Sequence, residues 1–168
     1  MNDIWEKLEV LNKEKNGRSL QLRTGAALKK IAKAEETMKL EFPLEFRDYL
    51  LLHDGQDNDE EAGLWRLGSL AEIVAQWKDE REQEKEYPEE NTGFVEKDKI
   101  LNRLRCPQWI PFLGAPFWDQ DIAYIDLSPG PKGKIGQVIA LVTECDFKVL
   151  APSFNAFLER WLKKGSPI

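Results

Sequence analysis

The sequence predicts an α+β fold in which an antiparallel-rich sheet is flanked by N-terminal helices and followed by a closing C-terminal helix. Apolar residues recur at helical spacing in several segments up to residue 77. Runs rich in β-branched residues follow between 122 and 142, and helical spacing returns after 153. Helices first, strands mainly later and a last helix are typical of α+β proteins.

Three helices are expected in the first 55 residues. We expect Thr24 to cap a second helix over 25–39. Pro43 suits the first position of a third helix, because its missing N–H costs nothing there. That helix should end at 53–55, where Gly55 can adopt the left-handed conformation. The short first helix is predicted from helical spacing of Ile4, Trp5, Leu8 and Leu11.

The middle of the chain contains the clearest helix signal. A polar loop over 56–63 and a short strand over 64–67 precede it. Ser69 and Glu72 have the spacing of a capping box, in which each side chain satisfies a free backbone N–H. The charged segment 78–91 is expected to be a frayed helix end and an exposed loop. The apolar face of this helix is Leu70, Ile73, Val74 and Trp77.

The second half of the chain is expected to form the sheet. A strand with an edge proline is predicted over 109–112. Two β-branched runs, 122–127 and 135–142, flank the turn-rich segment 128–134 and predict a β-hairpin with a long turn. A last strand is expected over 147–150.

The closing helix is predicted between an N-cap at Ser153 and a stop at Gly165. Its apolar face is Phe154, Phe157, Leu158 and Trp161. We expect one domain over 1–168, because the flanks of the charged segment 78–91 are too short for two cores.

Composition narrows the possible partners. With 24 Lys+Arg against 30 Asp+Glu the net charge is −6, which disfavours nucleic acid and anionic membranes and suits a basic partner. A hydrophobic fraction of 42% excludes a disordered chain. No apolar run reaches the roughly 20 residues of a membrane helix, and no signal peptide is visible. We expect a cytoplasmic protein in which Cys106 and Cys145 are reduced and buried.

Motifs for catalysis, cofactors and metals are missing. The one histidine, His53, is expected at a helix C-terminus, where the helix dipole favours a partly charged imidazole. Gly133 and Lys134 lack the following hydroxyl of a phosphate-binding loop and are assigned to a turn. Asp119, Asp121 and Asp126 are a weak alternative for a divalent-cation site. We predict no catalytic residue, no cofactor and no metal.

Acidic and aromatic loop residues are the candidates for partner contact. The first group is Asp57, Asp59, Glu60 and Glu61, and the second is Trp118, Asp119 and Asp121. A charged surface with an exposed aromatic can attract and anchor a cationic protein. Two alternatives stay open: the carboxylates form only a solvated surface, and Trp118 folds back on the sheet.

Seven short strings follow one another over about residues 22–162: TGA (24–26), LEFPLEFRDYL (40–50), HDG (53–55), WIPF (109–112), IDLSP (125–129), GQVI (136–139) and VLAPSF (149–154). In this order they resemble the SUKH superfamily. That superfamily includes fungal cell-wall-synthesis regulators and bacterial immunity proteins. One departure is the loop at 118–121, where members have Gly-rich residues before an aspartate and only Asp121 matches.

The resemblance implies an α+β fold without a catalytic centre. It further implies an intracellular immunity protein that binds and neutralises a secreted bacterial toxin domain, often a nuclease, by occluding its active face. We expect that cognate toxin to be basic and this chain to be a monomer or a weak homodimer. The alternative is a non-catalytic regulatory or scaffold module of the fungal type. Neither the toxin's identity nor its chemistry follows from the sequence.

Overall fold

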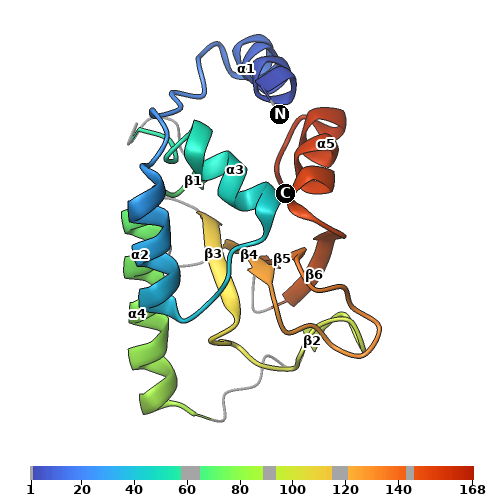
Figure 1. The fold of residues 1–168 in the computed structure, drawn as a ribbon. Coiled ribbons are helices and arrows are strands. Elements are labelled where there is room, and N and C mark those ends of the chain that lie inside the picture. Colours follow the sequence, from blue (N-terminus) through green and yellow to red (C-terminus); the bar gives the residue numbers. More distant parts are fainter. Residues whose placement is uncertain (1, 58–64, 89–93, 115–120, 143–145) are drawn as a thin grey trace.

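A computed structural model describes residues 2–57, 65–88, 94–114, 121–142 and 146–168. Within these residues it contains helices at the N-terminal end, one mixed sheet and a closing helix (Figure 1). The predicted α+β architecture is confirmed. None of the described helices has the length and apolar character needed to cross a membrane.

The sheet contains six strands within the described residues, in the order β1-β3-β4-β5-β6-β2. All neighbours pair antiparallel except β2, which runs parallel to β6. The predicted hairpin is formed by β4 and β5, and it lies at the centre of the sheet, whereas β2 was not predicted. The strands are β1 (Arg66–Leu67), β2 (Phe94–Val95), β3 (Trp109–Gly114), β4 (Ile122–Asp126), β5 (Gln137–Val142) and β6 (Asp146–Ala151).

Most of the predicted helical segments are confirmed, but two helices begin and one helix ends at residues other than those predicted. Thr24 is not a cap: the N-cap is Ala27, whose side chain makes no capping bond. Pro43 is the N-cap of the third helix rather than its first residue. The helix expected to fray from residue 78 continues to Glu86. The helices are α1 (Asn2–Asn16), α2 (Leu28–Met38), α3 (Leu44–Leu52), α4 (Leu70–Glu86) and α5 (Phe154–Lys164).

The predicted caps of α4 and α5 are present. Ser69 Oγ accepts from the N–H of Glu72, and the Glu72 carboxylate accepts from the N–H of Ser69. Ser153 Oγ accepts from the N–H of Ala156, and Gly165 ends α5 with φ 76°. These caps fix where each helix begins or ends relative to the sheet.

The larger core lies between one face of the sheet and the helices. Phe46 of α3, Phe112 of β3 and Phe154 of α5 meet there, with ring centroids 5.3–5.9 Å apart. Figure 1 shows α3 and α5 above this part of the sheet. Trp161 is buried, as predicted, but Trp77 is only partly buried.

The other face of the sheet is covered partly by the irregular segment 96–108. Ile100 of that segment packs in a second cluster with Trp109, Tyr124 and Phe147. The Trp109 ring lies 5.0 Å from Phe147 and 5.6 Å from Tyr124 between centroids. Both faces of the central strands are therefore buried, which explains why β3 and β4 read as continuous apolar runs.

The long turn between β4 and β5 packs tightly on the segment at Asp98–Lys99. The Gly130 N–H donates to the Lys99 carbonyl, and the Lys132 N–H donates to the Asp98 carbonyl. A Cβ on Gly133 would lie 2.3 Å from the Lys99 carbonyl oxygen. This close approach confirms turn chemistry, rather than a phosphate-binding loop, as the reason for the glycines.

Gly133→Ala is expected to lower the free energy of unfolding by about 2–3 kcal/mol, because a backbone carbonyl must move to admit the methyl group. Urea denaturation at neutral pH measures this change. Gly17→Ala is the control: a Cβ there meets no atom within 4 Å, although φ is +70°. Its expected cost is about 1 kcal/mol, and equal losses in the two variants would contradict the close-approach explanation.

Candidate functional site

Two of the seven predicted contact residues lie in the described part of the chain. The Asp57 side chain is 63% exposed and pairs with Arg23. Asp121 lies partly buried directly before β4. The other five, Asp59, Glu60, Glu61, Trp118 and Asp119, lie outside the described residues.

The strand register brings the flanks of both predicted loops to one end of the sheet. Arg66, which follows the first loop, pairs with Gly114, which precedes the second. Gly114 in turn pairs with Ile122, the residue after Asp121. The two acidic segments, almost 60 residues apart in the sequence, therefore connect to adjacent strands at the same end.

A third segment reaches this end of the sheet, and the sequence reasoning missed it. Ile122 pairs with Leu141, and Val142 pairs with Asp146, so the connection from β5 to β6 begins and ends here. The three segments 57–64, 115–121 and 143–146 contain no lysine, arginine or histidine. We call them together the acidic end; their carboxylates are Asp57, Asp59, Glu60, Glu61, Asp119, Asp121, Glu144 and Asp146.

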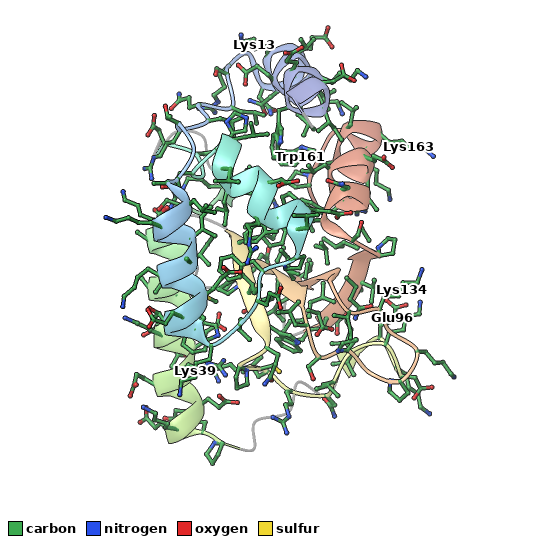
Figure 2. The ribbon with its side chains drawn as sticks, in the orientation of Figure 1. Lys13, Lys39, Glu96, Lys134, Trp161 and Lys163 are labelled. Carbon is green, nitrogen blue, oxygen red and sulfur yellow. The ribbon has the colours of Figure 1, made fainter. Side chains whose placement is uncertain are left out.

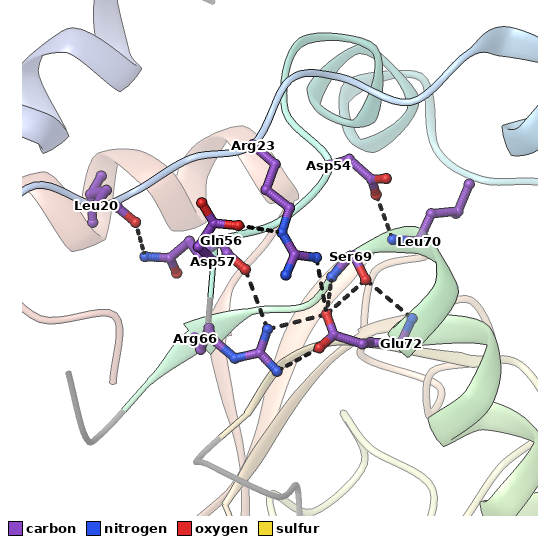
Figure 3. Close-up of polar contacts among 9 residues, drawn as sticks. All are labelled: Leu20, Arg23, Asp54, Gln56, Asp57, Arg66, Ser69, Leu70 and Glu72. Atoms are coloured by element: carbon purple, nitrogen blue, oxygen red, sulfur yellow. Dashed lines mark hydrogen bonds and ion pairs between the residues drawn. The ribbon is translucent and has the colours of Figure 1, made fainter. Parts of the chain in front are cut away.

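A polar network built on Glu72 anchors the described base of the acidic end (Figure 3). The Glu72 carboxylate accepts from Arg66 at 2.7 and 3.1 Å and from the Ser69 N–H and hydroxyl at 2.7 Å. A further guanidinium, that of Arg23, lies 3.9 Å away. These donors hold the pKa of Glu72 at about 2, well below its ordinary 4.5, although burial opposes them.

The same network orients the start of the first acidic loop. Arg23 Nε donates to the Asp57 carboxylate at 2.8 Å, and the Asp57 N–H donates to the Gln21 carbonyl. Gln56 joins two other segments, because its amide donates to the Leu20 carbonyl and accepts from the Leu67 N–H, both at 2.7 Å. The chain therefore enters the loop at Asp57 from a fixed position, with that carboxylate already paired.

Removal of the Glu72 carboxylate is expected to lower the free energy of unfolding by about 2 kcal/mol at pH 7, since a capping box and a half-buried ion pair are lost together. Because the folded-state pKa is depressed, this contribution is complete above pH 4.5 and disappears as pH falls towards 2. Urea denaturation of Glu72→Ala against the unmodified protein should show the difference narrowing below pH 4.5. Glu82→Ala, at a side chain 73% exposed, is the control.

His53 is the C-cap of α3, as predicted, but burial acts against the partly charged imidazole expected there. Burial lowers its pKa below the ordinary 6.5, and a backbone hydrogen bond with Arg23 opposes this only in part. The ring lies 5.4 Å from that of Trp5, in an edge-to-face arrangement. The direction of the pKa change at this position therefore follows desolvation.

Among the three aspartates considered for a divalent-cation site, Asp126 is fully buried, and its carboxylate already accepts hydrogen bonds from the protein. Its carboxylate accepts from Trp109 Nε1, Gln137 Nε2 and the Ser128 N–H, at 2.9–3.0 Å. Within the described ranges, no three or more His, Cys, Asp or Glu side chains form a group that could hold a metal ion. Cys106 is buried, and burial raises its thiol pKa; Cys145 lies outside the described residues.

Comparison with known proteins confirms the family suggested by the sequence strings. The cell wall biosynthesis/cell cycle regulator smi1 of Schizosaccharomyces pombe is 31% identical over 159 aligned residues, which cover 82% of this chain and 30% of that protein. The chain thus spans less than a third of the length of that relative. A model of the SMI1 / KNR4 family (SUKH-1) matches residues 25–160. Since this match includes most of the sequence, the chain belongs to the SMI1 / KNR4 family (SUKH-1).

Proposed function

We propose that this protein is an immunity protein that binds a secreted toxin domain through the acidic end and occludes its active face. The observation that carries the proposal is that the described flanks of three segments meet at one end of the sheet, and that the sequences of these segments contain eight carboxylates and no basic residue. Family membership supports a binding role without catalysis.

The expected partner is a basic domain such as a nuclease, whose active face must approach phosphates. Opposite charges on the two surfaces accelerate encounter and favour the correct partner. The Glu72 network contributes by holding the described base of the first acidic loop in one position. The protein itself makes or breaks no covalent bond in this mechanism, and it acts in the cytoplasm of the cell that would otherwise be poisoned.

The test is reconstitution with the toxin domain encoded beside this chain's gene. The proposal expects a complex that forms below micromolar concentration and abolishes the toxin's enzymatic activity at a 1:1 ratio. Absence of a complex at micromolar concentration, or a complex that leaves the toxin fully active, would contradict it. A toxin domain from an unrelated gene pair is the control for non-specific charge attraction.

A second candidate is a regulatory module that binds a signalling or wall-synthesis protein. The similarity to a protein described as a cell wall biosynthesis/cell cycle regulator favours it. Gene neighbourhood separates the two: a large secreted toxin encoded nearby supports immunity, and its absence supports regulation. Both candidates use a non-catalytic surface, and the monomer or weak homodimer stays a prediction for sedimentation analysis.

A further inference from the structure

The apolar stripe of α4 does not continue into its C-terminal half. Leu70 and Ile73 are buried and Trp77 partly so, yet the next inward position holds Glu80, whose side chain is 4% exposed. All of α4 is described, and Glu80 is its only buried residue after Ile73. An ionisable group therefore occupies the place where an amphipathic helix normally has an apolar anchor.

The carboxyl group of Glu80 is only half satisfied. Tyr124 of β4 donates its hydroxyl to Oε1 at 3.0 Å, and Gln76 Nε2 donates to the same oxygen at 3.1 Å. Oε2 is buried and has no hydrogen-bond partner. Arg81 forms an ion pair with this oxygen, but its Nη2 lies 3.8 Å from Oε2, beyond hydrogen-bonding distance.

Arg81 is held away from Glu80 by other contacts. Its Nη1 donates to Glu84 at 2.5 Å, and its guanidinium lies over the Trp77 ring, 5.5 Å from the centroid. The other cation that acts on Glu80 is Arg105, on the irregular segment 96–108. Ionisation would thus leave a buried carboxylate with one oxygen that accepts no hydrogen bond and with only the 3.8 Å ion pair to Arg81 for compensation, which is costly.

Burial raises the pKa of Glu80 to about 7, against the opposing effects of Gln76, Tyr124, Arg81 and Arg105. The phenol of Tyr124 is fully buried, and its pKa is raised well above 10 by burial and by Glu80 itself. Tyr124 therefore stays a neutral donor over the range in which Glu80 titrates. Of the two hydrogen-bonded groups, only the Glu80 carboxyl gains or loses a proton over that range.

We propose that Glu80 is a proton-dependent anchor, which holds the C-terminal half of α4 against the sheet when protonated and loosens that half when ionised. The ionised carboxylate recovers its hydration only by leaving the contact with Tyr124. Beyond Glu80, the Arg81 side chain is only 12% exposed but lies over Trp77 of the same helix, and no residue of 82–86 is buried. The proposal does not depend on the identity of the partner.

The sign of the pH effect follows from proton linkage. The folded pKa of about 7 lies above the ordinary 4.5, so the folded state binds more protons and stability falls as pH rises between these values. From pH 5 to pH 8, Glu80 should raise the unfolding equilibrium constant roughly 70-fold. Glu80→Gln should remove this rise, whereas Glu82→Gln, the same charge change at a side chain 73% exposed, should keep it.

Urea denaturation of the full chain at pH 5–8 measures the three proteins. His53 contributes with the opposite sign, because its pKa is lowered, but its contribution is common to all three and cancels in the comparison. An identical pH dependence in Glu80→Gln and the unmodified protein would overturn the proposal.

Two further measurements test the anchor in the unmodified protein, and they decide the question even if Glu80→Gln does not fold. Carbon-detected NMR of the glutamate carboxyls should show one resonance with a midpoint near pH 7. Amide exchange over 81–86, corrected for its intrinsic pH dependence, should accelerate from pH 6 to pH 8. No carboxyl midpoint above 5, or exchange independent of pH, would overturn the proposal.

Discussion

Replacement of Asp126 by alanine is expected to lower the free energy of unfolding by about 3–5 kcal/mol. The carboxylate is fully buried and accepts from Trp109, Ser128 and Gln137. Its removal leaves the buried Trp109 Nε1–H and the partly buried Ser128 N–H without an acceptor, whereas Gln137 Nε2 keeps its bond to the Lys99 carbonyl. Each unsatisfied group costs about 1–3 kcal/mol. Urea denaturation at pH 7 measures the loss.

Two further variants test whether the lost hydrogen bonds cause this decrease in the free energy of unfolding. Asp126→Asn keeps the shape and one acceptor oxygen, so we expect about half the effect. Asp98→Ala removes an exposed carboxylate that pairs with Lys132 nearby, and an exposed pair contributes about 0.2–1 kcal/mol. If Asp126→Ala lowered the free energy of unfolding by less than about 1 kcal/mol, the hydrogen bonds that Asp126 accepts would not be important for stability.

Reversal of two charges at the acidic end is expected to slow association with a basic toxin domain by 10- to 100-fold. Asp121→Lys with Asp146→Lys changes two partly exposed carboxylates that flank adjacent ends of the central strands. Electrostatic steering acts mainly on the association rate and is screened by salt. Stopped-flow measurements at low and at 0.5 M salt should show the difference shrinking as salt rises.

The matched control is Glu6→Lys with Glu159→Lys, on α1 and α5, which changes the net charge by the same amount at exposed positions. If the control slows association equally, net charge rather than the acidic end governs encounter. The melting temperature of both double variants should remain close to that of the unmodified protein.

The elements with local signals could be predicted from the sequence. Ser69 and Glu72 form the expected capping box, and α5 begins after Ser153 and ends at Gly165. These signals involve residues within one or two helical turns, so no distant contact is needed to interpret them. The turn glycines were likewise recognised, although their packing on Lys99 was not.

The wrong predictions involve distant contacts or the balance of small effects. Thr24 is not a cap because the residues between it and α2 pack on α3 in a non-helical conformation. The Ala26 N–H donates to the Leu50 carbonyl, and a Cβ on Gly25 would meet the Leu51 backbone. The segment after residue 78 stays helical because its Glu, Lys, Arg and Gln residues favour helices and pair one turn apart, as Arg81 does with Glu84.

The acidic end was only partly predictable. The charges of two loops were visible in the sequence, but the third segment joins them through the register of β5 and β6, which no local pattern specifies. The burial of Glu80 was likewise not predictable, because a glutamate in a charged segment is expected to be exposed to solvent. Its burial against Tyr124 depends on how the helix crosses the sheet.

Among the described residues, the two outermost strands of the sheet, β1 and β2, have two residues each. Edge strands this short expose few unpaired backbone N–H and C=O groups with which a neighbouring molecule could pair. On β1, the Gln56 N–H donates to the Leu67 carbonyl, and the Gln56 side chain accepts from the Leu67 N–H. Fibre growth by strand addition is thereby disfavoured. The arrangement thereby limits self-polymerisation when the protein is concentrated.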